Sequence, residues 1–164
     1  MNRVATSPFV EQGTSATVQF MRRLSLVVLA ALAGCPSGTP PPACIVVDTT
    51  CAPGYAPTFS NVYKNTIVPK CSMTSACHNT SGHQGGLSLG DGEDAAYTAL
   101  LASSTIDPSR KRVVPGDPAC SLLIVRTDAS GTDYQMPKGD PLSEVESCAL
   151  LQWVEAGAMA GSAR

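Results

Sequence analysis

The sequence predicts an all-α fold, a small domain of about four helices joined by long connections rich in glycine and proline. Apolar residues recur at helical spacing in several segments bounded by capping or breaking residues, whereas strand-like runs are few. The 164 residues include 14 glycines and 13 prolines but only 5% aromatic residues, which indicates a thin protein core. Such a core is expected where a large apolar cofactor fills the centre or where disulfides replace buried area.

The first predicted helix carries an apolar stripe at positions Phe59, Val62, Tyr63, Thr66 and Ile67. We expect this helix to end just before Cys71, since Pro69 interrupts its hydrogen bonding. A second helix is predicted from residues 92–94 to residue 101, because alanine and leucine there are strong helix formers. Between these helices, residues 79–92 are rich in Gly, Ser and Asn and form a long loop.

Two further helices are predicted near the C-terminus. Asp117 followed by Pro118 predicts a helix start, with the helix running through Val125 and fraying over residues 128–131. Ser143 and Glu146 form a capping box that predicts a last helix reaching Gly157.

The N-terminal segment has the layout of an export signal. Residues 1–34 combine a basic start at Met21-Arg22-Arg23 with an apolar run over residues 24–33, and residues 1–20 look like a mis-assigned start. The sequence Leu32-Ala33-Gly34-Cys35 resembles a bacterial lipobox, which implies cleavage before Cys35 and its lipidation. Residues 35–56 then form a tether with a loop between Cys44 and Cys51, residues 57–158 form the folded domain, and residues 159–164 form a tail.

Composition excludes some classes of partner. The net charge of −2 argues against nucleic-acid binding, which favours a clustered basic face. The basic run Arg110-Lys111-Arg112 is interpreted as a solvated loop. No nucleophile–base pair, phosphate loop or carboxylate pair is visible, so we expect a protein that is not an enzyme.

The cysteines other than Cys35 are expected to be bonded, because an export signal places them in an oxidising compartment. Cys44 and Cys51 lie close in sequence, and we expect a local disulfide between them. Cys120 and Cys148 have no neighbouring histidine, and we expect a disulfide that joins the last two helices.

The remaining two cysteines carry the strongest chemical signal. Cys71 and Cys77 are followed directly by His78, and a thiol pair ending in Cys-His attaches haem c through thioethers while the histidine binds the iron. Met136, followed by Pro137, supplies a soft thioether suited to the sixth position. Five residues separate the two thiols, where the usual motif has two.

Alternatives remain open for these residues. Cys71 and Cys77 could form a disulfide in a haemless relative, or act as a redox-active dithiol. His83 could replace Met136 as the sixth ligand, and together with Cys71, Cys77 and His78 it completes a set with zinc-like composition.

Several motifs in order resemble the c-type cytochrome domains of exported bacterial proteins, particularly lipid-anchored ones of delta-proteobacterial and planctomycete envelopes. The resemblance covers about residues 57–158 and rests on Cys71…Cys77-His78, Gly86-Leu87-Ser88-Leu89, Val114-Pro115-Gly116-Asp117-Pro118, Met136-Pro137 and the segment Leu142-Ser143-Glu144…Trp153-Val154-Glu155-Ala156-Gly157-Ala158.

The resemblance implies a cytochrome c-like fold, with Cys71 and Cys77 as thioether sites and His78 and Met136 as iron ligands. The loop at Pro115 and Gly116 could offer a carbonyl to the imidazole, and Trp153 is expected in the core near the haem edge. The predicted function is one-electron transfer with a redox partner protein of the envelope. We expect a monomer on the periplasmic side of a bacterial membrane, and the alternative function is a haemless, disulfide-stapled lipoprotein module that binds a protein or glycan.

Overall fold

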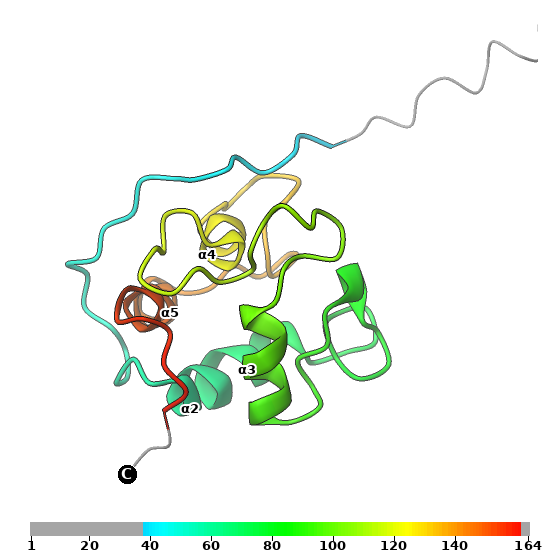
Figure 1. The fold of residues 1–164 in the computed structure, drawn as a ribbon, viewed down its shortest axis with the longest axis horizontal. Helices are drawn as coiled ribbons and strands as arrows, with labels where there is room; N and C mark the ends of the chain where they lie inside the picture. Colours follow the sequence, from blue (N-terminus) through cyan, green and yellow to red (C-terminus); the bar gives the residue numbers. More distant parts are fainter. Residues whose placement is uncertain (1–37, 162–164) are drawn as a thin grey trace, which may run out of the picture. The chain divides into compact units, whose positions relative to one another are not determined.

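The computed structural model describes residues 38–161, and this part of the chain is helical. Its elements are α2 (Phe59–Val62), η2 (Tyr63–Cys71), η3 (Gln84–Gly86), α3 (Glu93–Leu101), α4 (Leu122–Thr127) and α5 (Glu144–Glu155), joined by long connections (Figure 1). Over these described residues the one strand-like pairing is an isolated bridge between Ser103 and Lys111. The all-α prediction is therefore confirmed for residues 38–161, while the predicted signal peptide and the predicted lipidation site Cys35 lie outside them.

Helix α5 is the centre of the packing, because α2 and α4 both contact it. Trp153 of α5 is 1% exposed, and its ring lies 5.1 Å from that of Phe59, which in turn meets Tyr97 edge-on at 5.1 Å. The buried core around these rings consists of Phe59, Val62, Ile67, Leu89, Ala96, Leu100, Val113, Ile124, Leu142, Leu150, Leu151, Trp153, Val154 and Ala158. The prediction of Trp153 as a core residue is confirmed.

Both ends of α5 are closed by local hydrogen bonds. The Ser143 hydroxyl accepts from the Glu146 N–H, and the Glu146 carboxylate accepts from the Ser143 N–H at 2.8 Å, which confirms the predicted capping box. At the other end, Gly157 takes a positive φ of 95°, and the Ala158 N–H donates to the Trp153 carbonyl at 2.9 Å. The helix ends at Glu155 because this turn consumes its last carbonyls.

The helix before Cys71 ends close to its predicted position, although Pro69 lies inside it. After α2 the chain forms the wider π-type turns of η2, which pass through Pro69 and end at Cys71. A wider turn leaves room for the proline ring, so Pro69 does not end the helix. The predicted end just before Cys71 is confirmed to within one residue, because Cys71 is the last residue of η2.

The other helix predictions differ in accuracy. Helix α3 agrees with its prediction, and Glu93 and Asp94 place acidic groups in its first turn. Helix α4 begins later than predicted, at Leu122, because Asp117 caps a separate turn in which its carboxylate accepts from the Cys120 N–H at 3.1 Å. Among residues 38–161 no helix has the length and apolar character needed to cross a membrane.

The segment of residues 38–56, which we call the strap, crosses the domain as an extended chain on the outer side of α4 and α5 (Figure 1). Two disulfides fix it, Cys44–Cys120 and Cys51–Cys148. All four cysteines predicted to form disulfides do so, but the predicted pairs Cys44–Cys51 and Cys120–Cys148 are wrong. The extended strap carries Cys44 to the turn before α4 and Cys51 to α5, so each finds a distant partner.

Candidate functional site

An apolar cavity of about 230 Å³ brings together three of the residues predicted to bind a cofactor, Cys71, His78 and Met136. It is open on one side, where Ile106 stands 74% exposed at the rim. Its walls come from the end of η2, the loop after it, α3, α4 and two later loops, and consist of Cys71, His78, Gln84, Gly85, Leu87, Leu89, Leu100, Ser104, Ile106, Arg112, Leu122, Leu123, Arg126, Thr127 and Met136. Mostly apolar walls with a few polar groups are typical of cofactor sites.

The His78 imidazole is held in one orientation by a backbone carbonyl. Its Nδ1 lies 2.8 Å from the Gln84 oxygen, and because a carbonyl can only accept, Nδ1 must carry the proton. The free lone pair is therefore on Nε2. Burial lowers the pKa of His78 below its ordinary value of 6.5, so the ring is neutral at pH 7. A neutral imidazole with an oriented ring is suited to bind a metal.

The expected carbonyl partner for His78 was the loop at Pro115 and Gly116, and this expectation is wrong. The N–H of Gly116 donates to the Val154 carbonyl at 2.9 Å, and both loop residues are exposed and absent from the cavity wall. The partner is Gln84, only six residues after His78, so the loop itself orients the ring.

The five residues between the thiols form a compact turn. The Cys77 N–H donates to the Thr74 carbonyl at 2.9 Å, and the His78 N–H donates to the Cys71 carbonyl at 2.9 Å, which closes the segment at its base. Gly82 lies against this turn so closely that a Cβ there would overlap the carbonyl oxygens of Ser75 and Cys77. The five-residue spacing is thus accommodated by a turn, and only glycine fits at position 82, where the chain packs against that turn.

Cys71 and Cys77 are both free thiols, in contrast to the four cysteines in disulfides. Cys71 lines the cavity, whereas Cys77 is not among its lining residues and its sulfur lies 3.4 Å from the Thr74 hydroxyl. Burial, with smaller effects from Cys77 and Glu146, raises the pKa of Cys71 to about 12. Cys71 is therefore a neutral thiol at pH 7, which disfavours a reactive dithiol.

Met136 reaches the cavity from the loop of residues 128–141, which follows α4. Its N–H donates to the Arg126 carbonyl at 2.9 Å, so the loop folds back on the end of the helix. Gln135 stiffens the same loop, since its side chain accepts from the Gly131 N–H at 2.7 Å and donates to the Pro137 carbonyl at 3.0 Å. The structure therefore brings His78 and Met136, 58 residues apart in sequence, to one cavity.

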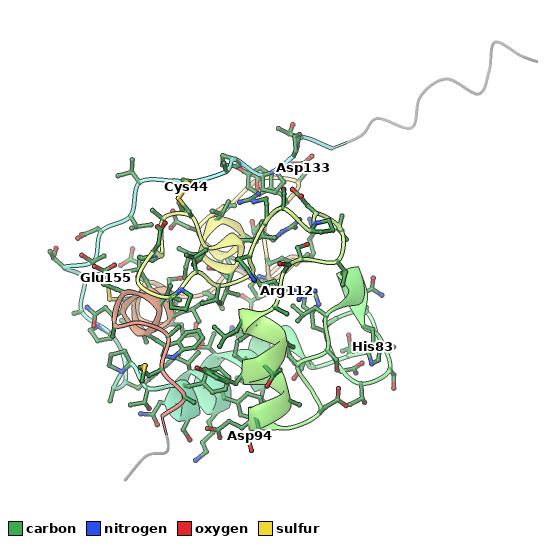
Figure 2. The ribbon with its side chains drawn as sticks, viewed as in Figure 1. Cys44, His83, Asp94, Arg112, Asp133 and Glu155 are labelled. Carbon is green, nitrogen blue, oxygen red and sulfur yellow. A yellow bond between two sulfur atoms is a disulfide. The ribbon has the colours of Figure 1, made fainter. Side chains whose placement is uncertain are left out.

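His83 lies apart from this cavity. It is exposed on the outer side of the loop after Cys77 (Figure 2) and is not among the lining residues. Within residues 38–161 there is no cluster of three or more His, Cys, Asp or Glu side chains that could hold a metal ion. The zinc set of Cys71, Cys77, His78 and His83 does not assemble.

Sequence reasoning missed two arginines in the cavity wall. Arg112 is 8% exposed, and its guanidinium donates to the carbonyls of Ala99 at 3.1 Å and Gly86 at 3.4 Å. Arg126 donates to the Tyr134 carbonyl at 3.3 Å. Burial lowers the pKa of both arginines.

Neither arginine has a carboxylate partner, because the one ion pair found among the described residues joins Lys70 to Asp140. The interpretation of residues 110–112 as a solvated loop is wrong for Arg112, whose side chain points inward above α3 (Figure 2). Two cations beside an apolar cavity favour a ligand that brings its own negative charge.

Trp153 is not part of the cavity wall and packs on Phe59 instead.

Comparisons with known proteins add no assignment, since no family model, curated protein or solved structure matches the chain.

Proposed function

We propose that this protein is an exported, lipid-anchored c-type cytochrome with one haem and a cytochrome c-like fold, which transfers single electrons at the cell envelope. The observation that carries the proposal is that His78 and Met136 line one apolar cavity, with the Nδ1 of His78 tied to a carbonyl. A neutral imidazole and a thioether are the ligand pair that holds haem iron in cytochromes c.

The chemistry of the wall fits haem in three further respects. The leucines and Ile106 that line the cavity match an apolar macrocycle, and Ile106 is 74% exposed. Arg112 and Arg126 supply two cations without carboxylate partners, and haem carries two propionates. Cys71 is a free thiol in the same wall, which supports its proposed role as a thioether site.

Haem would supply the one-electron chemistry, and the protein residues would tune and protect it. His78 would bind the iron through Nε2, since its Nδ1 proton is engaged with Gln84. The thioether of Met136 would favour Fe(II) over Fe(III) and raise the reduction potential. The leucines would keep water from the iron, and the two arginines would compensate the propionates within a wall of low polarity.

The alternative of a haemless module requires a disulfide between Cys71 and Cys77. The two disulfides of the strap agree with a stapled module, but Cys71 and Cys77 are both free, which argues against the bond between them. The proposed role is that of a carrier, which would work as a monomer with a redox partner protein on the periplasmic side.

The test is expression of the exported protein in a host with cytochrome c maturation. We expect a red protein whose haem survives acid–acetone extraction and gives a pyridine haemochrome spectrum. In the matched variant Cys71→Ser/Cys77→Ser, which keeps His78, the haem should be lost or become extractable, because both thioether sites are gone. A colourless wild-type protein with a Cys71–Cys77 disulfide in peptide mass spectrometry would contradict the proposal.

A further inference from the structure

We propose that the loop of residues 128–141, which carries Met136, faces the lipid bilayer, because the strap delivers the lipid anchor to that loop. This inference rests on the lipidation of Cys35 within the proposed function, but it does not depend on haem. The surface concerned is the edge around Asp133, and its occupant is a phospholipid membrane.

The strap is held at successive points up to its first described residues. The Cys44–Cys120 disulfide fixes its middle, and Ile45 donates to the Ala119 carbonyl at 2.9 Å. Closer to the N-terminus, the Arg110 guanidinium donates to the carbonyls of Pro41 at 3.1 Å and Ala43 at 3.0 Å. The strap therefore cannot swing freely about Cys44.

The last contact toward the anchor is made on the loop that carries Met136. The Thr39 N–H donates to the Asp133 carboxylate at 2.7 Å, and Gly38 lies against the same side chain. Asp133 precedes Met136 by three residues in this loop. The chain thus leaves the domain at the edge that supplies the proposed sixth ligand.

The remaining chain is short. Thr39 follows Cys35 by four residues, and four residues span at most about 14 Å even when fully extended. A lipidated Cys35 sits at the membrane surface, so Asp133 must stay close to that surface. Because the strap is bonded at Arg110 and Cys120 as well, the domain cannot turn this edge away without breaking those contacts.

The opposite edge of the domain provides a reference point. Asp94 in the first turn of α3 and Asp133 lie at opposite ends of the described domain (Figure 2). Asp94 is exposed and makes no side-chain hydrogen bond that anchors a neighbouring element. A bilayer that contacts residues beside Asp133 therefore leaves Asp94 free, and with it the α3 side for a protein partner.

The experiment uses the full-length lipidated protein in vesicles of phosphatidylethanolamine and phosphatidylglycerol. The photoreactive residue p-benzoylphenylalanine is introduced at Thr132, which is exposed beside Asp133, or at Asp94 as the matched control. After illumination, lipid adducts are counted by mass spectrometry, which also measures the lipid on Cys35. Each variant is repeated as Cys35→Ser and with twelve Gly/Ser residues inserted between Ser37 and Gly38.

We expect roughly fivefold or more adduct at position 132 than at position 94, and loss of this excess when the insertion lengthens the tether. In the Cys35→Ser variants adducts should fall to background at both positions. Equal labelling at the two positions, or an excess at position 94, would overturn the orientation. Absence of lipid on Cys35 would overturn the anchor itself. Haem content is measured separately and affects none of these outcomes.

Discussion

The strap side and the cavity side of the domain are held together by different kinds of bond. On the strap side, residues 38–56 are bonded to the turn before α4 and to α5 by two disulfides. On the cavity side, the long segment from Cys71 to residue 92 contains two free thiols and is held without a disulfide, by turns and by hydrogen bonds such as those from His78 to Gln84 and from Arg112 to Gly86. The comparison teaches that the strap side is cross-linked within the protein, whereas the cavity side keeps two free thiols and is the side to which we assign the proposed cofactor.

The largest effect should come from the ligand on the cavity side. His78→Ala should lower haem incorporation by about tenfold or more, because the proximal ligand and the residue next to a thioether site change together. His83→Ala is the matched control, since His83 is exposed and outside the cavity wall. Haem per protein, measured by pyridine haemochrome, should be near wild type for the control. Equal loss of haem in both variants would contradict the assignment of His78, rather than His83, as the proposed iron ligand.

Removing a disulfide of the strap should lower the stability of the fold without changing the visible spectrum. The Cys51–Cys148 bond spans 97 residues, and the chain-entropy model assigns about 4 to 5 kcal/mol to a loop of that size. Cys51→Ser/Cys148→Ser should therefore lower the free energy of unfolding in urea by a few kcal/mol while the visible spectrum stays unchanged. A spectrum that changes with the disulfide would show that the two sides are not separable.

Met136→Ala should keep covalent haem but lower the reduction potential and remove the weak charge-transfer band of the Met–iron bond, because thioether sulfur favours Fe(II). Met73→Ala is the matched control, since Met73 is 68% exposed in the turn between the thiols and does not line the cavity. Both quantities come from spectroelectrochemistry. The assignment of Met136 fails if Met136→Ala leaves them unchanged while His83→Ala alters them.

A smaller change in potential should follow from removing one cation of the cavity wall. Arg126→Gln should lower the reduction potential, because a nearby positive charge stabilises the reduced iron more than the oxidised iron. Lys111→Gln removes the same charge from an exposed position and should have little effect, since water screens it. Indistinguishable potentials for the two variants would argue against Arg126 as a partner of the cofactor.

Local signals predicted part of this structure correctly. The capping box at Ser143 and the acidic start of α3 act within a few residues, so their effects can be derived from the sequence. Long-range pairing cannot be derived in this way. Six cysteines allow 15 connectivities, and the choice depends on the path of the strap across α4 and α5.

The sequence predicted three of the residues that line the cavity but not the groups that support them, and Cys77, predicted with them, does not line it. Cys71, His78 and Met136 meet at one cavity as expected, because residue type and order carry that information. The Gln84 carbonyl could not be identified, since every residue has such a group and only the backbone path selects one. Arg112 was missed because burial of one member of a basic run depends on tertiary contacts rather than composition.

The two disulfides interleave along the chain, since Cys51 lies within the loop closed by Cys44 and Cys120, and Cys148 lies beyond it. A chain that crosses a membrane with its N-terminus first exposes Cys44 and Cys51 to oxidant long before either partner arrives. The first bond formed should therefore be the non-native one between these neighbours, and thiol–disulfide exchange must then correct it. Alkylation of free thiols at early times, followed by peptide mapping, would reveal that Cys44–Cys51 species. For the exported protein that we propose, we expect the strap to reach its final pairing through exchange of that bond with the thiols of Cys120 and Cys148.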